Sequence, residues 1–143
     1  MMIGEKHVET LNLQNGLKLE IWDQSRIIAG DRWLVRMEAR AAVPLREEYF
    51  HFVPEKDRAY FILRRVLGTE VTYNHVQEKH FVDANQKEEV FNRFVDIFKK
   101  NTLPYLQHPD FSRRFCLSRY RELKARDPRL FLDPHPYEKV LPE

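Results

Sequence analysis

The chain has 143 residues, which fits a single domain, since two smaller pieces would each be too short to bury a good core. Hydrophobic residues make up 43% of the sequence, which excludes wholesale disorder. The 24 basic and 22 acidic residues nearly cancel, so the net charge indicates no polyanionic partner.

A single cysteine excludes an intrachain disulfide framework and zinc sites built from several cysteines. The first residues lack the apolar stretch of a secretory signal, and no window is apolar and long enough to span a bilayer. We therefore expect a cytoplasmic protein that makes no contact with membranes.

Residues 8–43 show the period-two alternation of three antiparallel strands that have one apolar and one charged face. Asn15 and Gly16 mark the first hairpin. The parity of the apolar positions favours a three-residue loop with Gly16 in the left-handed conformation, because this loop pairs Leu11 with Leu19.

The register between the second and third strands is predicted from charge. Placing Glu20 opposite Arg36 sets unlike charges across from each other along both strands. The same register makes Trp22 and Leu34 an apolar pair on the charged face. Such a pair would be covered by a second copy of the chain or by apolar residues of the tail, namely Phe131, Leu132 and Tyr137.

The middle of the chain combines a helix and a strand. A short amphipathic helix is predicted from about residue 57 up to Gly68. Residues 71–82 follow as a fourth strand, and the change of phase within it predicts a bulge near Asn74 and His75. The apolar arc of the helix consists of Ala59, Ile62, Leu63, Val66 and Leu67.

The strongest helical pattern covers residues 86–101, with Asn85 and Glu88 at the spacing of an N-terminal cap. A last helix is predicted over residues 110–126. Half of the eight prolines lie in residues 128–143, so regular structure is not expected there. The apolar arc of the first of these helices consists of Val90, Phe91, Phe94, Val95, Ile97 and Phe98.

These elements predict an α+β fold, in which helices pack on one face of an antiparallel sheet of about four strands. The predicted order is strand-strand-strand-helix-strand-helix-helix. We predict one α+β domain over residues 1–127 and a proline-rich, extended C-terminal tail over residues 128–143.

The connection between the second and third strands, residues 23–32, is the first candidate binding site. Ten residues exceed a tight hairpin, and long loops on rigid sheets commonly carry binding sites. Aromatic anchors beside arginine are typical of interfaces. In the alternative interpretation, Ile27 and Ile28 plug the underside of the sheet while the charges pair locally. The candidate residues are Trp22, Asp23, Arg26, Asp31, Arg32, Trp33 and Leu34.

Residues 112–129 form the second candidate, because they contain seven basic and two acidic residues. Such a segment suggests a polyanion or nucleic-acid site. In helical projection, however, the bases flank an apolar stripe on both sides, which equally fits long side chains lying along that stripe with their charges in water. The candidate residues are Arg113, Arg114, Arg119, Arg121, Lys124 and Arg126.

A small-ligand or enzymatic cleft near the fourth strand is the third candidate, with Tyr73, His75, Glu78 and His80 as its polar groups. The two histidines are five residues apart, which sends them to opposite faces of a regular strand. A metal site would therefore need a distortion, and we predict no metal and no cofactor.

Recognisable catalytic motifs are missing from the sequence: there is no GxSxG motif, no glycine-rich phosphate loop and no metal-binding histidine spacing. Cys116 falls in the apolar stripe of the last helix, where a thiol usually behaves as a small hydrophobe. We therefore expect a non-catalytic module that binds another protein or self-associates, for example as a homodimer. Polyanion binding and a small-ligand or enzymatic cleft remain the alternatives.

Overall fold

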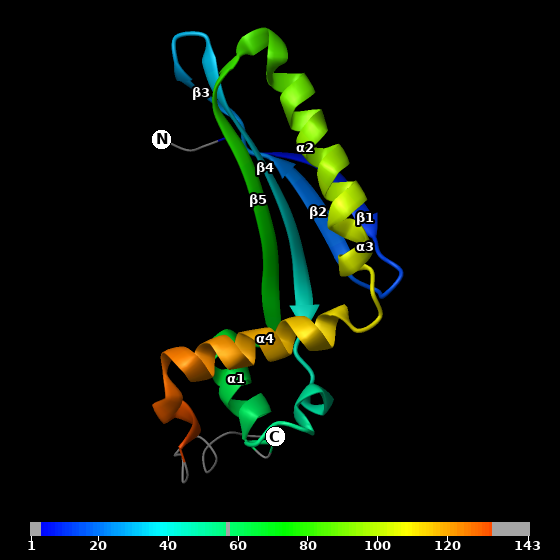
Figure 1. Cartoon of the computed structure of the whole chain (residues 1–143), viewed down its shortest axis with the longest axis vertical. Coiled ribbons are helices and arrows are strands. Elements are labelled where there is room, and N and C mark those ends of the chain that lie inside the picture. Colours follow the sequence, from blue (N-terminus) through cyan, green and yellow to red (C-terminus); the bar gives the residue numbers. More distant parts are fainter. Residues whose placement is uncertain (1–3, 57, 133–143) are drawn as a thin grey trace. The chain divides into compact units, whose positions relative to one another are not determined.

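The structure is a computed structural model that describes residues 4–56 and 58–132, and its fold is α+β as predicted. The strands are β1 (Lys6–Asn12), β2 (Lys18–Asp23), β3 (Arg26–Ala29), β4 (Arg32–Pro44) and β5 (Glu70–Asp83). The helices are α1 (Ala59–Leu67), α2 (Lys87–Asn101), α3 (Leu103–Leu106) and α4 (Phe111–Arg126). The described residues also contain the 3-10 turns η1 (Glu47–Phe50), η2 (Ala84–Gln86) and η3 (Pro128–Phe131). Figure 1 labels the strands and the α-helices along the chain.

The chain divides into two compact units. Among the described residues, the first contains 4–42 and 72–109, and the second contains 43–56, 58–71 and 110–132. The domain boundaries drawn from the sequence stay a prediction, and each unit is described by itself below.

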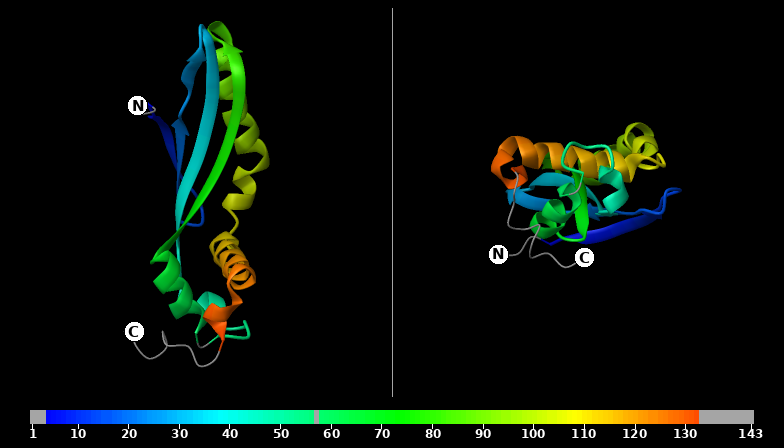
Figure 2. Two further views of the ribbon diagram at one scale, coloured as in Figure 1. Left: turned by 90° about the vertical axis from the view of Figure 1, so that its left-hand side faces the viewer. Right: turned by 90° about the horizontal axis from the view of Figure 1, so that it is seen from below.

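The first unit is a curved antiparallel sheet with helix α2 along one face (Figures 1 and 2). β2 pairs with β1 on one side and β4 on the other, while β3 and β5 also pair with β4. The first hairpin is confirmed: Leu11 lies opposite Leu19, and Gly16 has a φ of 93°. The Gly16 N–H donates to the carbonyl of Leu13 at 3.0 Å, which closes the three-residue loop.

The predicted register between the second and third strands is wrong. Glu20 lies opposite Arg40 and Trp22 opposite Glu38, four residues away from the predicted pairing. Both registers place unlike charges across from each other and keep the apolar residues on one face, so charge alone does not distinguish them. Trp22 and Leu34 are therefore not a pair.

Residues 23–32 are not a long loop, because most of them extend the hairpin. β3 pairs with the beginning of β4, and Gly30 and Asp31 form its turn, where Gly30 has a φ of 57°. The register shifts by one residue at Ile28. Ile27 is 58% exposed, so the interpretation of this segment as an apolar plug is also wrong.

Helix α2 supplies the apolar layer over the sheet. Its buried side chains are those of Phe91, Phe94, Val95 and Phe98, whereas Ile97, predicted in the same arc, is 42% exposed. The ring of Phe98 lies 5.3 Å from that of His75 on β5. The predicted cap at Asn85 is wrong, since the turn η2 precedes the helix and its N-cap residue, Gln86, makes no side-chain capping bond.

β5 keeps a regular alternation past the position where a bulge was predicted. Asn74 bonds to Glu38, and Glu78 to Arg36, so both side chains reach the face opposite α2. The irregularity lies nearer the end of the strand, where Phe81 has a φ of 60°. Such a conformation is an outlier for an aromatic residue.

The second unit surrounds its own buried cluster. α1 ends at Gly68, whose N–H donates to the carbonyl of Arg64 at 2.9 Å, as the sequence predicted. Val66 and Leu67, predicted to be buried, are exposed. α4 buries the predicted stripe together with its first residue. The buried residues of these two helices are Ala59, Ile62, Leu63, Phe111, Cys116, Leu117, Tyr120 and Leu123.

The start of the tail is folded, contrary to the prediction that residues from 128 onward are extended. They form the turn η3, and the ring of Phe131 meets that of Tyr120 edge-on at 5.5 Å. Arg58 donates to the carbonyl of Phe131 at 3.0 Å. Phe131 therefore belongs to the core of the second unit, Leu132 is exposed, and Tyr137 lies outside the described residues. Within the described residues, no helix has the length and apolar character needed to cross a membrane.

Candidate ligand-binding pocket

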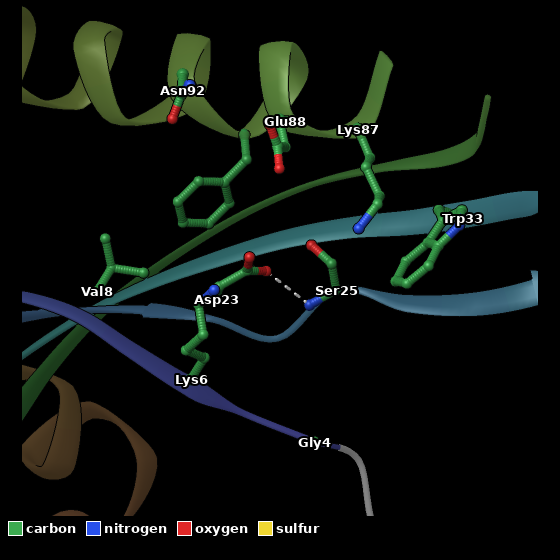
Figure 3. A pocket seen from close by; sticks show the side chains of 10 residues that line it. Gly4, Lys6, Val8, Asp23, Ser25, Trp33, Lys87, Glu88 and Asn92 are labelled. Carbon is green, nitrogen blue, oxygen red and sulfur yellow. Dashed lines mark hydrogen bonds between the residues drawn. The ribbon is translucent and has the colours of Figure 1, made fainter. Parts of the chain in front are cut away.

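The first unit contains a pocket of about 390 Å³ between one end of the β1–β2 pair and the N-terminal half of α2 (Figure 3). This volume lies within the usual range for small-molecule sites, roughly 300 to 1,000 Å³. The lining residues are Gly4, Lys6, Val8, Asp23, Ser25, Trp33, Lys87, Glu88, Phe91 and Asn92.

Two irregularities in the strands shape the floor of the pocket. In β1 the register shifts at Val8, so that Lys6, and not His7, lies opposite Asp23. Between β2 and β3, the Ser25 N–H donates to Oδ1 of Asp23 at 2.9 Å, a local turn that short acidic side chains favour. The Ser25 hydroxyl accepts the N–H of Arg36 at 3.0 Å, which fixes the bend against β4.

Helix α2 supplies the roof. Lys87, Glu88, Phe91 and Asn92 follow the spacing of one helix face, and Figure 3 shows this part of α2 above the strands. The Lys87 ammonium lies 4.1 Å from the centre of the Trp33 ring on β4. This cation–π contact joins the helix to the sheet at one end of the pocket.

The pocket holds two positive and two negative side chains. Lys6 and Lys87 carry the positive charges, and Asp23 and Glu88 carry the negative ones. Among the residues that the structure describes, no ion-pair partner lies within 4.0 Å of any of the four. Opposite charges inside one concave site therefore remain available to a ligand.

Only part of the predicted binding loop belongs to this pocket. Asp23 and Trp33 line it, whereas Trp22 lies on the other face of the sheet. There the Arg40 guanidinium lies 4.5 Å from the Trp22 ring, and His7 meets that ring edge-on at 5.2 Å. The two tryptophans thus do not form one surface.

The remaining residues of that predicted site lie apart from the pocket. Leu34 is buried, and Arg26 is exposed on β3. Arg32 pairs with Asp83 and, at 3.8 Å, with Asp31. Of the four charged residues in the segment, Arg32 and Asp31 pair with each other, so the alternative interpretation of local charge pairing holds only in part.

The charged face of the sheet carries a connected polar network. Gln24 donates to Glu38 at 2.8 Å and accepts from Arg36 at 2.7 Å, while Arg40 donates to Glu38 at 2.7 Å and also contacts Glu5. Burial opposes ionisation of Glu38, but hydrogen bonds from Arg40 and other donors outweigh it and lower its pKa. The network satisfies its own charges, which marks it as structural.

The basic helix α4 pairs much of its charge with neighbouring acids. Arg113 and Arg114 bond to Asp110, at 2.7 and 3.3 Å. Arg119 pairs with Glu122 at 3.2 Å, and Lys124 with Glu55 at 2.6 Å, while Arg121 and Arg126 are exposed. This pairing favours the solvated-face interpretation over a polyanion site.

The polar groups predicted to line a cleft near the fourth strand do not all lie on one face of the sheet. His75 packs on Phe98, while Glu78 pairs with Arg36 on the opposite face of the sheet. Tyr73 is half-buried and its pKa is raised by burial, while His80 is exposed beside Phe81. Within the described part of the chain, no group of three or more His, Cys, Asp and Glu side chains is arranged to hold a metal ion.

Cys116, which is buried, and Glu55, which is partly exposed, make polar contacts within the second unit. The Cys116 thiol faces the carbonyl of Pro44 at 3.7 Å, and burial raises its pKa to about 12. Glu55 accepts the hydroxyl of Tyr120 and the Lys124 ammonium. Burial opposes ionisation of Glu55, but the bonds from Lys124 and Tyr120 outweigh it and lower its pKa.

Sequence reasoning missed most of the pocket. Lys6, Ser25, Lys87, Glu88 and Asn92 were not selected, since the pocket depends on a register shift and on the turn of α2 that lies above it. A signal existed for one wall, because the predicted apolar arc of α2 contains Phe91.

The fold and the pocket define an α+β protein with a polar cavity between an antiparallel sheet and a helix. Comparison of the chain with protein-family models, with curated proteins and with solved structures finds no significant match.

Proposed function

We propose that this protein is a non-catalytic binding module whose pocket under the N-terminal half of α2 holds a small ligand. The observation that carries the proposal is the pocket itself. It combines a volume suited to small molecules, two aromatic walls and polar groups that converge from β1, β2, the bend at Ser25 and α2. Such a combination is the usual starting hypothesis for a ligand site.

The composition of the pocket supports binding over catalysis. Among its lining residues there is no histidine, cysteine or tyrosine to serve as a base or nucleophile. Its one hydroxyl, that of Ser25, already accepts the backbone N–H of Arg36. The carboxylates, ammonium groups and amide that remain are suited to charge-assisted hydrogen bonds that orient a ligand.

The structure favours this site over the wider interaction surface expected from the sequence. The expected surface required Trp22, Trp33 and Leu34 to lie together, but Trp22 is covered by Arg40 on the far face of the sheet. Trp33 instead forms a wall of the pocket and contacts Lys87. The proposed binding site is therefore the concave pocket and not the interaction surface expected from the sequence.

The test is a titration of isotopically labelled protein with a set of neutral, cationic, anionic and zwitterionic small molecules, followed by amide chemical shifts. We expect at least one compound to shift the amides of the residues that line the pocket, with saturation. Asn92→Trp places an indole in the pocket and should abolish these shifts. Lys100→Trp, on the same helix but outside the pocket, should leave them unchanged. Shifts confined to other surfaces would refute the proposal.

A further inference from the structure

We propose that the ligand of this pocket is a small zwitterion, which carries an ammonium and a carboxylate on an apolar body. This inference rests on the proposed function and adds the chemical class of the ligand. It follows from the two carboxylates and the two ammonium groups that line the pocket and from its aromatic walls.

The negative pair is suited to an ammonium group. Oδ1 of Asp23 is held by the Ser25 N–H, which orients the carboxylate without neutralising it. Glu88 on α2 adds a second carboxylate to the same pocket (Figure 3). Both are free of ion-pair partners among the described residues, so an incoming ammonium gains charge-assisted hydrogen bonds that no described lysine supplies.

The positive pair is suited to a carboxylate. Lys87 is held over the Trp33 ring at 4.1 Å, which limits its freedom before any ligand binds. Lys6 on β1 is the second positive group. A ligand with only one kind of charge would satisfy one pair and leave the other without a partner, which a zwitterion avoids.

The apolar walls determine the rest of the ligand. Phe91, Val8 and Trp33 line the pocket together with the four charges. Aromatic and apolar side chains of this kind favour a ligand body with its own ring or branched chain. The combined chemistry is that of an α-amino acid with an apolar side chain.

The test uses three matched probes: L-phenylalanine, its amide, which lacks the carboxylate, and its N-acetyl derivative, which lacks the ammonium. Binding is measured by calorimetry and by the emission of the two tryptophans. We expect phenylalanine to bind at least about tenfold more tightly than either derivative, because each loses a charge-assisted interaction.

Two variants assign the charges to their partners. Asp23→Asn keeps an acceptor for the Ser25 N–H and should weaken the preference over the N-acetyl derivative, since Glu88 remains, while keeping the preference over the amide. Lys87→Met keeps an apolar stem on Trp33 and should do the reverse. Asp96→Asn and Lys100→Met, which lie on α2 outside this pocket, are the matched controls and should change neither preference.

The outcomes separate this inference from the proposed function. Equal binding of all three probes, tighter binding of either derivative, or no binding of phenylalanine would overturn the zwitterion. If a different compound then shifts the pocket amides, the binding module stands without it. If no compound shifts them, both proposals fail.

Discussion

Replacing Phe98 by alanine tests whether α2 is held to the sheet by the buried face seen here. Phe98 is 1% exposed, and its ring lies 5.3 Å from that of His75. Truncation of a buried phenylalanine removes its transfer free energy and leaves a cavity, which together cost about 3 to 5 kcal/mol. That is a large part of a total unfolding free energy of roughly 5 to 15 kcal/mol.

The neighbouring residue provides the matched control. Ile97 is 42% exposed, so Ile97→Ala should cost less than about 1 kcal/mol. Urea unfolding followed by tryptophan emission measures both variants. Because Trp22 and Trp33 both belong to the first unit, this signal reports the unfolding of the unit that contains α2.

The unfolding free energies of the two variants test whether the face of α2 that contains Phe98 is docked on the sheet. A cost for Phe98→Ala below about 1 kcal/mol would refute the docking of this face on the sheet, since a buried ring cannot be removed so cheaply. Equal costs for Phe98→Ala and Ile97→Ala would refute the assignment of the two side chains to the buried and exposed faces.

Three further predictions follow from single groups. The Cys116 thiol has a pKa of about 12 against an ordinary 9. At pH 8 it should therefore react with a thiol reagent roughly a thousandfold more slowly in the native state than after unfolding. Equal rates would contradict its burial. Gly16→Ala should cost about 1 to 2 kcal/mol in thermal unfolding, because φ is 93° there, whereas Gly4→Ala should be neutral; equal costs would count against the left-handed loop. Glu55 has a native pKa below the ordinary 4.5, so its stabilising contribution is present above pH 4.5 and is lost as pH falls through the native pKa. The free energy of unfolding of Glu55→Gln should therefore depend less on acid pH than that of the original chain. An unchanged dependence would contradict the link to Lys124.

The register of β2 and β4 shows how sequence information can be sufficient and still be combined wrongly. Gly30 and Asp31 are a two-residue hairpin signal, which places Ala29 opposite Arg32. Extended without interruption, that register would set Ile21 opposite a charged residue. The extra residue at Ile28 restores the parity and brings Ile21 opposite Ala39. The Gly30–Asp31 turn, combined with the requirement that apolar residues share one face, implies a bulge in β3. The charge pattern alone favoured a register four residues away.

The candidate site was less accessible to sequence reasoning than the fold. Asp23 and Trp33 were selected, but for an interaction loop that the structure replaces by a hairpin. The basic helix and the histidines were selected for their residue types. In the structure, much of the basic charge of α4 pairs with local acids. His75 packs on Phe98, whereas His80 is exposed beside Phe81.

The sequence by itself determined the α+β class, the limits of most elements, the faces that they bury and the first hairpin. These follow from periodicity and turn residues, which act over a few neighbours along the chain. Only the tertiary structure decided the pocket. Its walls come from residues near positions 6, 23, 33 and 88, and they meet because of a bulge at Val8, a bend at Ser25 and the docking of α2. Such meetings depend on the packing of distant segments, and the alternation of apolar and polar residues within each segment does not encode them.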